Sequence, residues 1–350
     1  MLKVGIIGVG SISDMHIQPY LKNREVELVA FCDLNEKRLQ EKGEKNRITQ
    51  LYTNYNELLQ NDSIDAVSIC TWNNSHAEIA IAALEAGKHV LVEKPLSMTV
   101  EAAEAVEAVV NKTGKTLQIG FVRRHGDNAI LLKKFIDHDD LGEIYYAKAS
   151  CLRRLGNPGG WFSYITKSGG GPLIDLGVHM VDICWYLMGK PSPISVSGNT
   201  YKKLGNRSHI KNLSFYKAAD YDPTINDVED LTNALIRFEN GASLMVDVSF
   251  TLQAKKDEVS VKMYGEKGGA EIEPELAIIS EKHDTILNIT PQVDHLGFDF
   301  NAAFTNEINH FVSCCLHGTE NLAPVKDGVT VMKMLNGIYE SAKLNKEIYL

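Results

Sequence analysis

The feature that most constrains the fold is a regular alternation of apolar and amphipathic segments in the first third of the chain. Short apolar runs, typical of buried strands, lie at residues 2–7, 26–32, 66–70, 90–92 and 116–119. Amphipathic helical patterns separate them, such as those at 76–86 and 100–112. Strands that alternate with helices favour right-handed crossovers and a parallel sheet covered on both faces. This part of the chain therefore predicts a nucleotide-binding type of α/β domain.

The first apolar run ends in a glycine-rich turn that opens a helical pattern. Gly8 and Gly10 have the spacing of a tight turn whose backbone approaches a pyrophosphate at a helix N-terminus. Ser13 stands where a third glycine is common, and it fulfils that role if the position only requires a small residue. The turn predicts a phosphate-binding loop to which Ser11 and Ile12 also belong.

An acidic residue, Asp33, ends the second apolar run, 25 residues after Gly8. A carboxylate at this position accepts hydrogen bonds from the ribose hydroxyls of an adenosine and repels a 2′-phosphate. It therefore favours NAD over NADP. A structural alternative is that Asp33 caps the helix expected at 35–46.

Small polar residues follow the third run, in the order Thr71, Trp72, Asn73, Asn74, Ser75 and His76. At the carboxyl edge of a parallel sheet such residues can face the nicotinamide ribose. Trp72 either stacks on a ligand or packs, and Ser75 or Asn74 can cap the next helix. The capping role and the cofactor role are compatible.

The fourth run ends abruptly in Glu93, Lys94 and Pro95. A lysine at the end of such a strand lies at the ligand-binding edge of the sheet, where it can take part in a reaction of the bound ligand. Pro95 fixes the direction in which the chain leaves, and its peptide bond is a candidate for the cis form. Lys94 is a candidate for catalysis and for cofactor binding, or it is a solvated lysine at a strand end. Glu93 either contacts the ribose of the cofactor or only holds the turn.

The pattern changes after Gly120: a helical run extends to Asp137, and from residue 144 onward strand follows strand. Apolar runs lie at 144–154, 194–203, 231–239, 242–251, 258–264 and 277–280, with hairpin residues such as Asn240 and Gly241 between them. Such spacing indicates an antiparallel sheet. Two amphipathic helices, at 300–316 and 327–343, either cover one face of this sheet or return to the first domain. We expect domains at 1–121 and 122–350.

A second cluster of chemical groups lies on a helix expected at 172–187. Asp175 and His179 are four residues apart and share one face of that helix. A carboxylate that orients an imidazole is a common way to build a general base. The structural alternative is an acid in the first helical turn and a histidine packed in the core. Because no further ligand set accompanies them, we predict no metal site.

The loop at 153–162 lies between the first long strand of the second domain and this helix. Its position makes it a wall of the expected substrate pocket. Trp161 offers a stacking surface for a sugar, and Arg154 and Asn157 offer partners for hydroxyl groups. The alternative is an ordinary surface loop.

Composition excludes several classes of function. The 350 residues carry a net charge of −9, with a pI near 5.7, which argues against nucleic acid or an anionic membrane as partner. No apolar run is long enough to span a membrane, and the start of the sequence lacks the pattern of a signal peptide. We therefore expect a cytoplasmic protein.

Together these motifs resemble the glucose-fructose oxidoreductase / inositol 2-dehydrogenase family over essentially the whole chain. The matching positions are the glycine turn, Asp33, the 71–76 loop, Glu93-Lys94-Pro95, Gly120-Phe121 with Arg123, and the run from Gly170 to His179. The sequence departs from the family pattern at Trp72, where proline is usual. The resemblance implies a Rossmann domain, a second α+β domain with an open, mainly antiparallel sheet, and homodimers or homotetramers built on that sheet. It also implies Arg123 as a further cofactor contact, and sugars, glycosides or inositols as substrates.

The expected reaction is that of an NAD(P)-dependent dehydrogenase acting on a CH–OH group. His179 accepts the hydroxyl proton while hydride passes to NAD, Lys94 stabilises the negative charge on the oxygen, and Asp175 orients the pair. Lysine is ordinarily protonated at neutral pH, which favours histidine as the base, although the family permits either residue. Two rival functions remain: an NAD-dependent glycosidase that works by transient oxidation, and a non-catalytic sensor of NAD or sugar.

Overall fold

The computed structural model describes residues 1–218 and 221–350. The chain forms two compact units. The first contains Met1–Val122 and Phe304–Met332, and the second contains Arg123–Ala303 and Lys333–Leu350. The segment 304–332 therefore belongs to the first unit, although in the sequence it lies between the two segments of the second.

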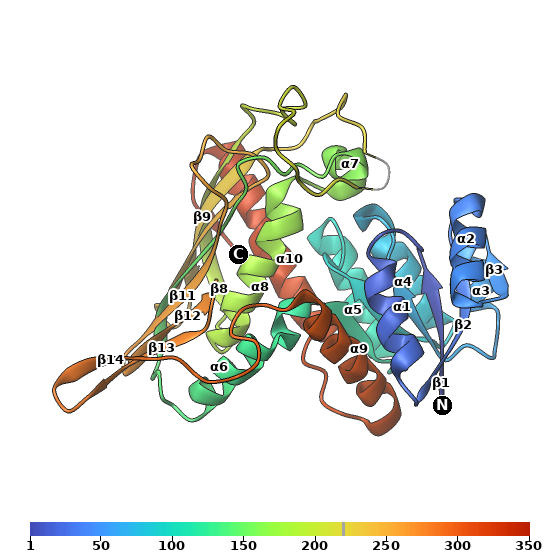
Figure 1. Cartoon of the computed structure of the whole chain (residues 1–350), viewed down its shortest axis with the longest axis horizontal. Coiled ribbons are helices and arrows are strands. Elements are labelled where there is room, and N and C mark those ends of the chain that lie inside the picture. Colours follow the sequence, from blue (N-terminus) through green and yellow to red (C-terminus); the bar gives the residue numbers. More distant parts are fainter. Residues whose placement is uncertain (219–220) are drawn as a thin grey trace. The chain divides into compact units, whose positions relative to one another are not determined.

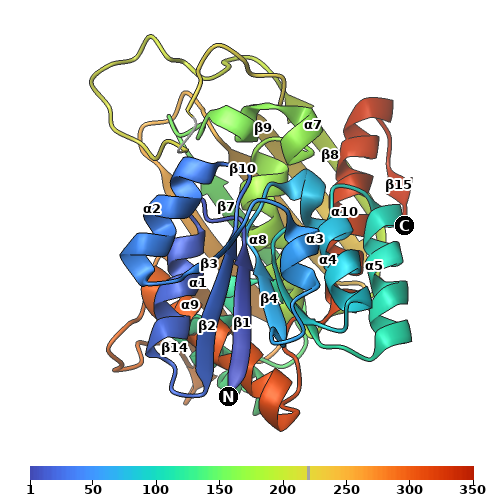
Figure 2. The ribbon, with the colours of Figure 1, turned by 90° about the vertical axis from the view of Figure 1, so that its right-hand side faces the viewer.

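The first unit is built on a parallel sheet with the strand order β3-β2-β1-β4-β5-β6. The strands are β1 (Leu2–Ile7), β2 (Val26–Cys32), β3 (Gln50–Tyr52), β4 (Ala66–Ile69), β5 (His89–Glu93) and β6 (Leu117–Gly120). The helices between them are α1 (Ser13–Lys22), α2 (Glu36–Asn46), α3 (Tyr55–Leu59), η1 (Asn73–Ser75), α4 (His76–Glu85) and α5 (Val100–Thr113). Figure 2 looks onto the strands, with α1 and α2 to one side and α4 and α5 to the other.

The alternation in the sequence predicted this unit correctly. β1 and β2 have the expected bounds, and each of the other three predicted strands differs by one residue at one or both ends. Sequence analysis missed β3, whose three residues are half-exposed or exposed and give no apolar run. The carboxyl ends of the parallel strands form the ligand-binding edge of such a sheet.

Helix α9 (Phe300–His317) contributes to the core of the first unit. Ile308 and Phe311 are buried in the same cluster as Val4, Ile17 and Phe31. Burial of each such side chain stabilises the fold by roughly 1.5–3 kcal/mol. For α9, the structure thus selects a return to the first domain over a position on the second sheet.

The second unit is built on a mixed, mainly antiparallel sheet. Among the described residues it has the order β14-β13-β12-β11-β7-β10-β9-β8-β15, and the pair β7 and β10 is parallel. The strands are β7 (Ile144–Leu152), β8 (Pro193–Tyr201), β9 (Leu231–Phe238), β10 (Ser243–Ser249), β11 (Glu258–Gly265), β12 (Gly268–Glu273), β13 (Ala277–Lys282), β14 (Thr285–Ile289) and β15 (Ile348–Tyr349). The predicted open antiparallel sheet is confirmed. β12, β14 and β15 were missed because they are short and carry glycine or exposed residues.

Helices cover one face of this sheet. They are η2 (Val122–His125), α6 (Asp127–Asp137), η3 (Gly160–Ser163), α7 (Ile165–Ser168), η4 (Leu173–Gly177), α8 (Val178–Leu187) and the part of α10 (Val325–Leu344) that begins at Lys333. Figure 1 shows α6, α8 and α10 on the same side of the strands. Gly198 of β8 lets α10 approach closely, since a Cβ atom there would lie 2.8 Å from Ile338. None of the described helices is long and apolar enough to cross a membrane.

Candidate active site

The glycine turn after β1 has the geometry of a phosphate-binding loop. Gly8 has a φ angle of +89°, and a Cβ atom there would lie 2.7–2.9 Å from backbone atoms of Cys70 and Thr71. This position therefore requires glycine for the fold itself. By contrast, a Cβ atom on Gly10 would have no heavy atom within 4 Å. The open space beside Gly10 fits the approach of a ligand pyrophosphate to the backbone.

The third position of the motif has a structural function of its own. The hydroxyl of Ser13 donates a hydrogen bond of 2.7 Å to the carbonyl oxygen of Gly10, and Ser13 is fully buried. Helix α1 begins at Ser13, with Ile12 half-buried and Ser11 exposed before it. Serine thus closes the turn in place of the usual glycine.

Asp33 joins the glycine turn to the start of α2. One carboxylate oxygen accepts a hydrogen bond from the amide of Val9, and the other from the amide of Asn35, both at 2.8 Å. Arg38 lies 3.9 Å from the same carboxylate. The side chain that caps α2 is that of Asn35, which accepts from the amide of Arg38. Asp33 is therefore not the cap of this helix, and its carboxylate lies at the edge where a ribose would bind.

The loop after β4 is held by His76. The ring of His76 is buried and makes two contacts with backbone oxygens, 2.7 Å from Nδ1 to Pro95 and 3.1 Å from Nε2 to Thr71. Burial lowers the pKa of His76, although these contacts oppose the effect. Asn73 is buried, whereas the indole of Trp72 is 38% exposed. His76 thus connects the loop after β4 to the turn after β5.

The turn after β5 rests on a buried hydrogen bond that sequence analysis missed. Glu93 lies 2.8 Å from the Nε2 atom of His16, which projects from α1 and is fully buried. Burial raises the pKa of Glu93, but the hydrogen bond and charge of His16 outweigh this effect and lower the pKa. The Lys94-Pro95 bond is cis, and Lys94 is half-exposed among buried neighbours. A polar residue on the buried face of α1 was the available signal for His16.

The predicted catalytic helix in the second unit begins with an unusually wide turn. Residues Leu173–Gly177 form a π-helical turn, which α8 continues from Val178. Such turns are rare and occur frequently at functional sites. Among residues 171–188, every residue except Asp175 and His179 is buried. Gly177 makes room for packing, since a Cβ atom there would lie 2.8 Å from Leu173.

Two arginines at the start of the second unit make ion pairs. Arg124 is buried and donates from Nε and Nη2 to the carboxylate of Asp182 on α8. Arg123, predicted as a cofactor contact, pairs with Glu273 and lies 4.6 Å from the centre of the Phe298 ring. The cofactor role of Arg123 stays a prediction.

The residues predicted to bind substrate differ in their surroundings. Asn157 is buried, and its amide contacts Gly159, Ser163 and Asn226. Arg154 is exposed and donates to the carbonyl oxygen of Lys255. Trp161 is half-buried and stacks on Phe162 with 3.9 Å between ring centres.

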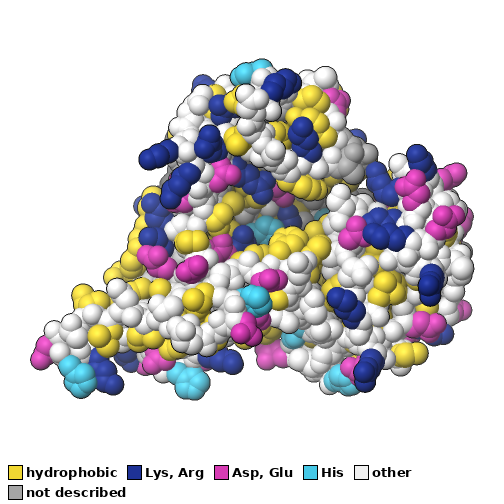
Figure 3. Space-filling view, in the orientation of Figure 1, with side chains coloured by type: hydrophobic (Ala, Val, Ile, Leu, Met, Phe, Trp, Pro, Cys, Tyr) yellow, Lys and Arg dark blue, Asp and Glu magenta, His cyan; other side chains and the backbone are white. Residues whose placement is uncertain are grey.

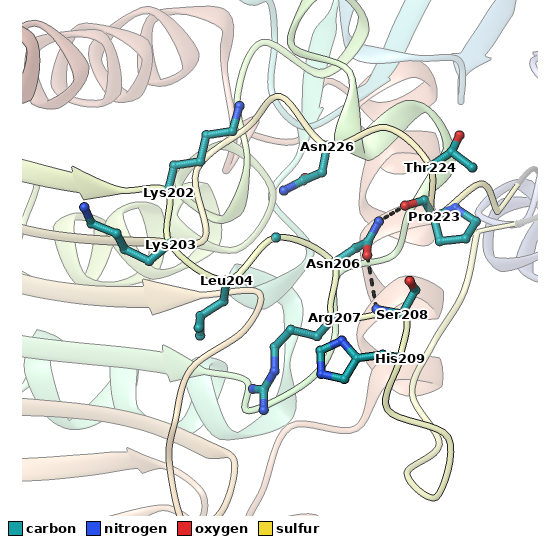
Figure 4. Close-up of a pocket in the computed structure, with 11 residues that line it drawn as sticks. Lys202, Lys203, Leu204, Asn206, Arg207, Ser208, His209, Pro223, Thr224 and Asn226 are labelled. Carbon is teal, nitrogen blue, oxygen red and sulfur yellow. Dashed lines mark hydrogen bonds between the residues drawn. The ribbon is translucent and has the colours of Figure 1, made fainter.

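A basic pocket of about 520 Å³ lies in the long connection between β8 and β9. Figure 4 shows Lys202 and Lys203 extending away from His209. The guanidinium of Arg207 donates to the carbonyl oxygens of Arg154 and Leu252, so it holds the loop. The pocket therefore lacks a convergent set of groups for an anion. The described residues also contain no group of three or more His, Cys, Asp or Glu that could hold a metal ion.

Comparison with known proteins identifies the family. An oxidoreductase family with an NAD-binding Rossmann fold matches residues 2–121, and the C-terminal α/β domain of the same family matches residues 133–350. The chain belongs to this oxidoreductase family. The glycine turn and Asp33 fit the dinucleotide that its Rossmann domain binds.

Several curated relatives of this oxidoreductase are named as dehydrogenases of a glucoside or an inositol. D-glucoside 3-dehydrogenase from Escherichia coli (strain K12) is 31% identical, over 100% of this chain and 97% of that protein. Myo-inositol 2-dehydrogenase from Thermotoga maritima is 27% identical, over 76% of this chain and 74% of that protein.

A solved structure of similar fold is an oxidoreductase domain protein from Kribbella flavida. It has a TM-score of 0.86 and 26% identity, over 99% of this chain and 98% of that one. Levoglucosan dehydrogenase, solved with NADH and levoglucosan, has the same TM-score at 22% identity and covers 99% of both chains. That second likeness concerns the fold alone.

Proposed function

We propose that this oxidoreductase uses NAD to oxidise a secondary alcohol of a sugar, glycoside or inositol, with D-glucosides as the first candidates. The proposal for the substrate follows from the 31% identity to a D-glucoside 3-dehydrogenase along the whole chain. In functional terms we assign NAD binding to residues 1–121, and substrate binding and oligomerisation to 122–350.

The observation that carries the proposal is the exposure of two chemical groups on a buried helix. Asp175 and His179 alone interrupt the buried surface of residues 171–188. Carboxylate and imidazole side chains are rarely buried without a partner, and at these two positions they remain partly open to solvent and therefore to a ligand. Their presence there, next to a π-helical turn, favours a role in chemistry over a role in packing.

In the proposed mechanism, His179 accepts the proton of the substrate hydroxyl and Asp175 orients its ring. NAD, held by the glycine turn and Asp33, would supply the acceptor for the hydrogen of the same carbon, so that the alcohol would be oxidised to a carbonyl group. Lys94 donates a hydrogen bond to the reacting oxygen and stabilises the negative charge that develops as the proton leaves. His76 and the Glu93–His16 pair hold the turn that carries Lys94.

A substrate panel tests the proposal. D-glucosides, free hexoses, pentoses and inositols are each incubated with NAD or NADP, and cofactor reduction is followed by absorbance. We expect continuous NADH formation with at least one of them, and with NAD preferred. The His179→Ala variant should lose this turnover and still bind NADH, since the dinucleotide-binding turn lies in the first unit. Normal turnover by that variant would contradict the assignment of the base.

The same panel separates the rival functions. A glycosidase that oxidises transiently would release the aglycone of an aryl glucoside without accumulating NADH, and a sensor would bind ligand without turnover. No feature of the site favours either over a dehydrogenase.

We further propose that the chain forms a homodimer or homotetramer through the outer face of the large sheet. Tyr264 and Met245 are each about 40% exposed, and Tyr264 stacks on Tyr146 with 5.4 Å between ring centres. Figure 3 shows hydrophobic side chains along the sheet. Light scattering of the wild type and of Met245→Glu tests this proposal: the wild type should be oligomeric and the variant monomeric. Location in the cytoplasm stays a prediction from sequence.

A further inference from the structure

The helix that carries Asp175 and His179 has a buried acid at its N-terminus. The carboxylate of Glu229 accepts hydrogen bonds from the amides of Gly171, at 2.9 Å, and Leu173, at 3.2 Å. Glu229 is 9% exposed, and both amides belong to buried residues. The first amides of a helix have no partner within it, and the partial positive charge at that end attracts a carboxylate.

A buried tyrosine holds this carboxylate in place. The hydroxyl of Tyr339, on α10, donates a hydrogen bond of 2.8 Å to Glu229. Burial, and then the negative charge of Glu229, raise the pKa of Tyr339 well above its usual value. The phenol therefore stays protonated and remains a donor to the carboxylate.

The arrangement explains the glycine run that precedes the helix. A Cβ atom on Gly170 would collide with the hydroxyl of Tyr339, and one on Gly171 would lie 2.5 Å from the carbonyl oxygen of Glu229. These two glycines therefore allow Glu229 and Tyr339 to approach the first turn of the helix. Sequence analysis singled out the run without a reason for it.

The residues next to Glu229 hold the neighbouring loops. Asp227 accepts a hydrogen bond of 2.6 Å from the amide of Ile165 at the start of α7. The carboxylate of Asp230 accepts from the amides of residues 203, 204 and 205. Glu229 is the member of this segment that contacts the catalytic helix directly.

We infer that Glu229 is a positioning residue for the dehydrogenase reaction, because it fixes the first turn of the helix and thereby the places of Asp175 and His179. The inference rests on the proposed catalytic role of those two residues. Asp175 is only two residues from Leu173, and its own amide donates to the carbonyl oxygen of Gly171 at 3.1 Å. A shift of the turn would thus move the acid that orients the base.

The test compares Glu229→Gln and Tyr339→Phe with two control variants that make the same chemical change elsewhere. The controls are Glu281→Gln, an exposed acid on β13, and Tyr349→Phe, whose side chain is 78% exposed. Each protein is assayed for kcat and KM with NAD and methyl β-D-glucoside, or the best substrate of the panel, and for NADH binding by fluorescence. His179→Ala serves as the reference for loss of the base.

We expect Glu229→Gln to lower kcat by about 10- to 100-fold, the usual effect of a small misplacement of catalytic groups. Tyr339→Phe should lower it about threefold to tenfold, since the amide contacts of Glu229 remain. In both variants NADH affinity and the KM for NAD should stay within about twofold of the wild type, and the controls should match the wild type throughout.

Wild-type kcat in folded Glu229→Gln would overturn the inference, and so would an equal loss of NADH affinity, which would indicate a general structural defect. If Glu229→Gln does not fold, Tyr339→Phe decides: a selective loss of kcat supports the inference and an unchanged kcat overturns it. If no substrate of the panel reduces NAD in the wild type, the proposed function fails instead. If His179→Ala turns over normally, only the assignment of the base fails, so these failures are distinguishable from that of the inference.

Discussion

Substitution by alanine should have different effects at the two glycines of the turn after β1. We expect a loss of stability at Gly8 and a loss of NADH binding at Gly10. At Gly8, alanine would bring a Cβ atom within 2.9 Å of three backbone atoms and force a side chain into a φ angle of +89°. Backbone strain of this kind costs about 1–3 kcal/mol, and backbone contacts that close cannot relax by a rotamer change. At Gly10, alanine meets no heavy atom within 4 Å. Its effect on the free energy of unfolding should stay within about 0.5 kcal/mol.

The loss of NADH affinity should come from Gly10→Ala, and the loss of stability from Gly8→Ala. The methyl group of Gly10→Ala fills the space that the pyrophosphate approaches, so we expect NADH affinity to fall at least about tenfold, or about 1.4 kcal/mol, while the melting temperature stays the same. Gly8→Ala should lower the melting temperature by several degrees, at about 2–4 °C per kcal/mol. Thermal denaturation and NADH fluorescence titration measure the two effects. Wild-type NADH affinity in folded Gly10→Ala would refute the assignment of this turn to the cofactor.

Three further substitutions test other parts of the structure. Asp33→Asn removes the charge that repels a 2′-phosphate, so the affinity for NADP relative to NAD should rise about tenfold in competitive titrations; an unchanged ratio would count against the ribose role. Asp182→Ala leaves the guanidinium of Arg124 buried without its counter-charge and should cost about 3–5 kcal/mol in chemical denaturation, whereas Asp137→Asn, in an exposed pair, should cost less than about 0.5 kcal/mol. Because burial lowers the pKa of His76, the unfolded chain takes up a proton below pH about 6.5 that the folded chain does not. The melting temperature should therefore fall between pH 7.5 and 5.5, less steeply in His76→Gln; equal slopes would exclude His76 as a contributor.

Much of the fold could be predicted from the sequence, because buried parallel strands leave continuous apolar runs. β1 and β2 were predicted to the residue for this reason. The edge strand β3 and the strand β12, which begins with two glycines, lack such a run because their stability comes from pairing with a neighbour. Their hydrogen bonds depend on residues distant in sequence, which a local pattern does not contain.

Sequence analysis predicted those candidate site residues that lie at the end of a strand or on one face of a helix. Gly8, Gly10 and Asp33 were predicted as cofactor contacts because the dinucleotide-binding turn of a Rossmann domain has a fixed spacing. The supporting residues were missed because they are remote: His16 lies 77 positions from Glu93, and Glu229 lies 58 from Gly171. No periodicity connects such pairs.

The sequence also does not show which partner a polar side chain in a loop contacts. The structure shows the amide oxygen of Asn157 accepting hydrogen bonds from Gly159 and Ser163, and its contact with substrate hydroxyls stays a prediction. A side-chain amide in a loop forms hydrogen bonds with the backbone of that loop as readily as with a ligand. Only the folded loop distinguishes the two uses.

Transfer of a labelled hydrogen tests the central claim most directly. A D-glucoside deuterated at every ring carbon is incubated with the protein and NAD, and the reduced cofactor is analysed by mass spectrometry. The account predicts that each molecule of reduced cofactor gains a single deuterium from the sugar, whichever carbon is oxidised. Reduced cofactor without deuterium, or no reduction with any sugar, glycoside or inositol of the panel, would contradict it.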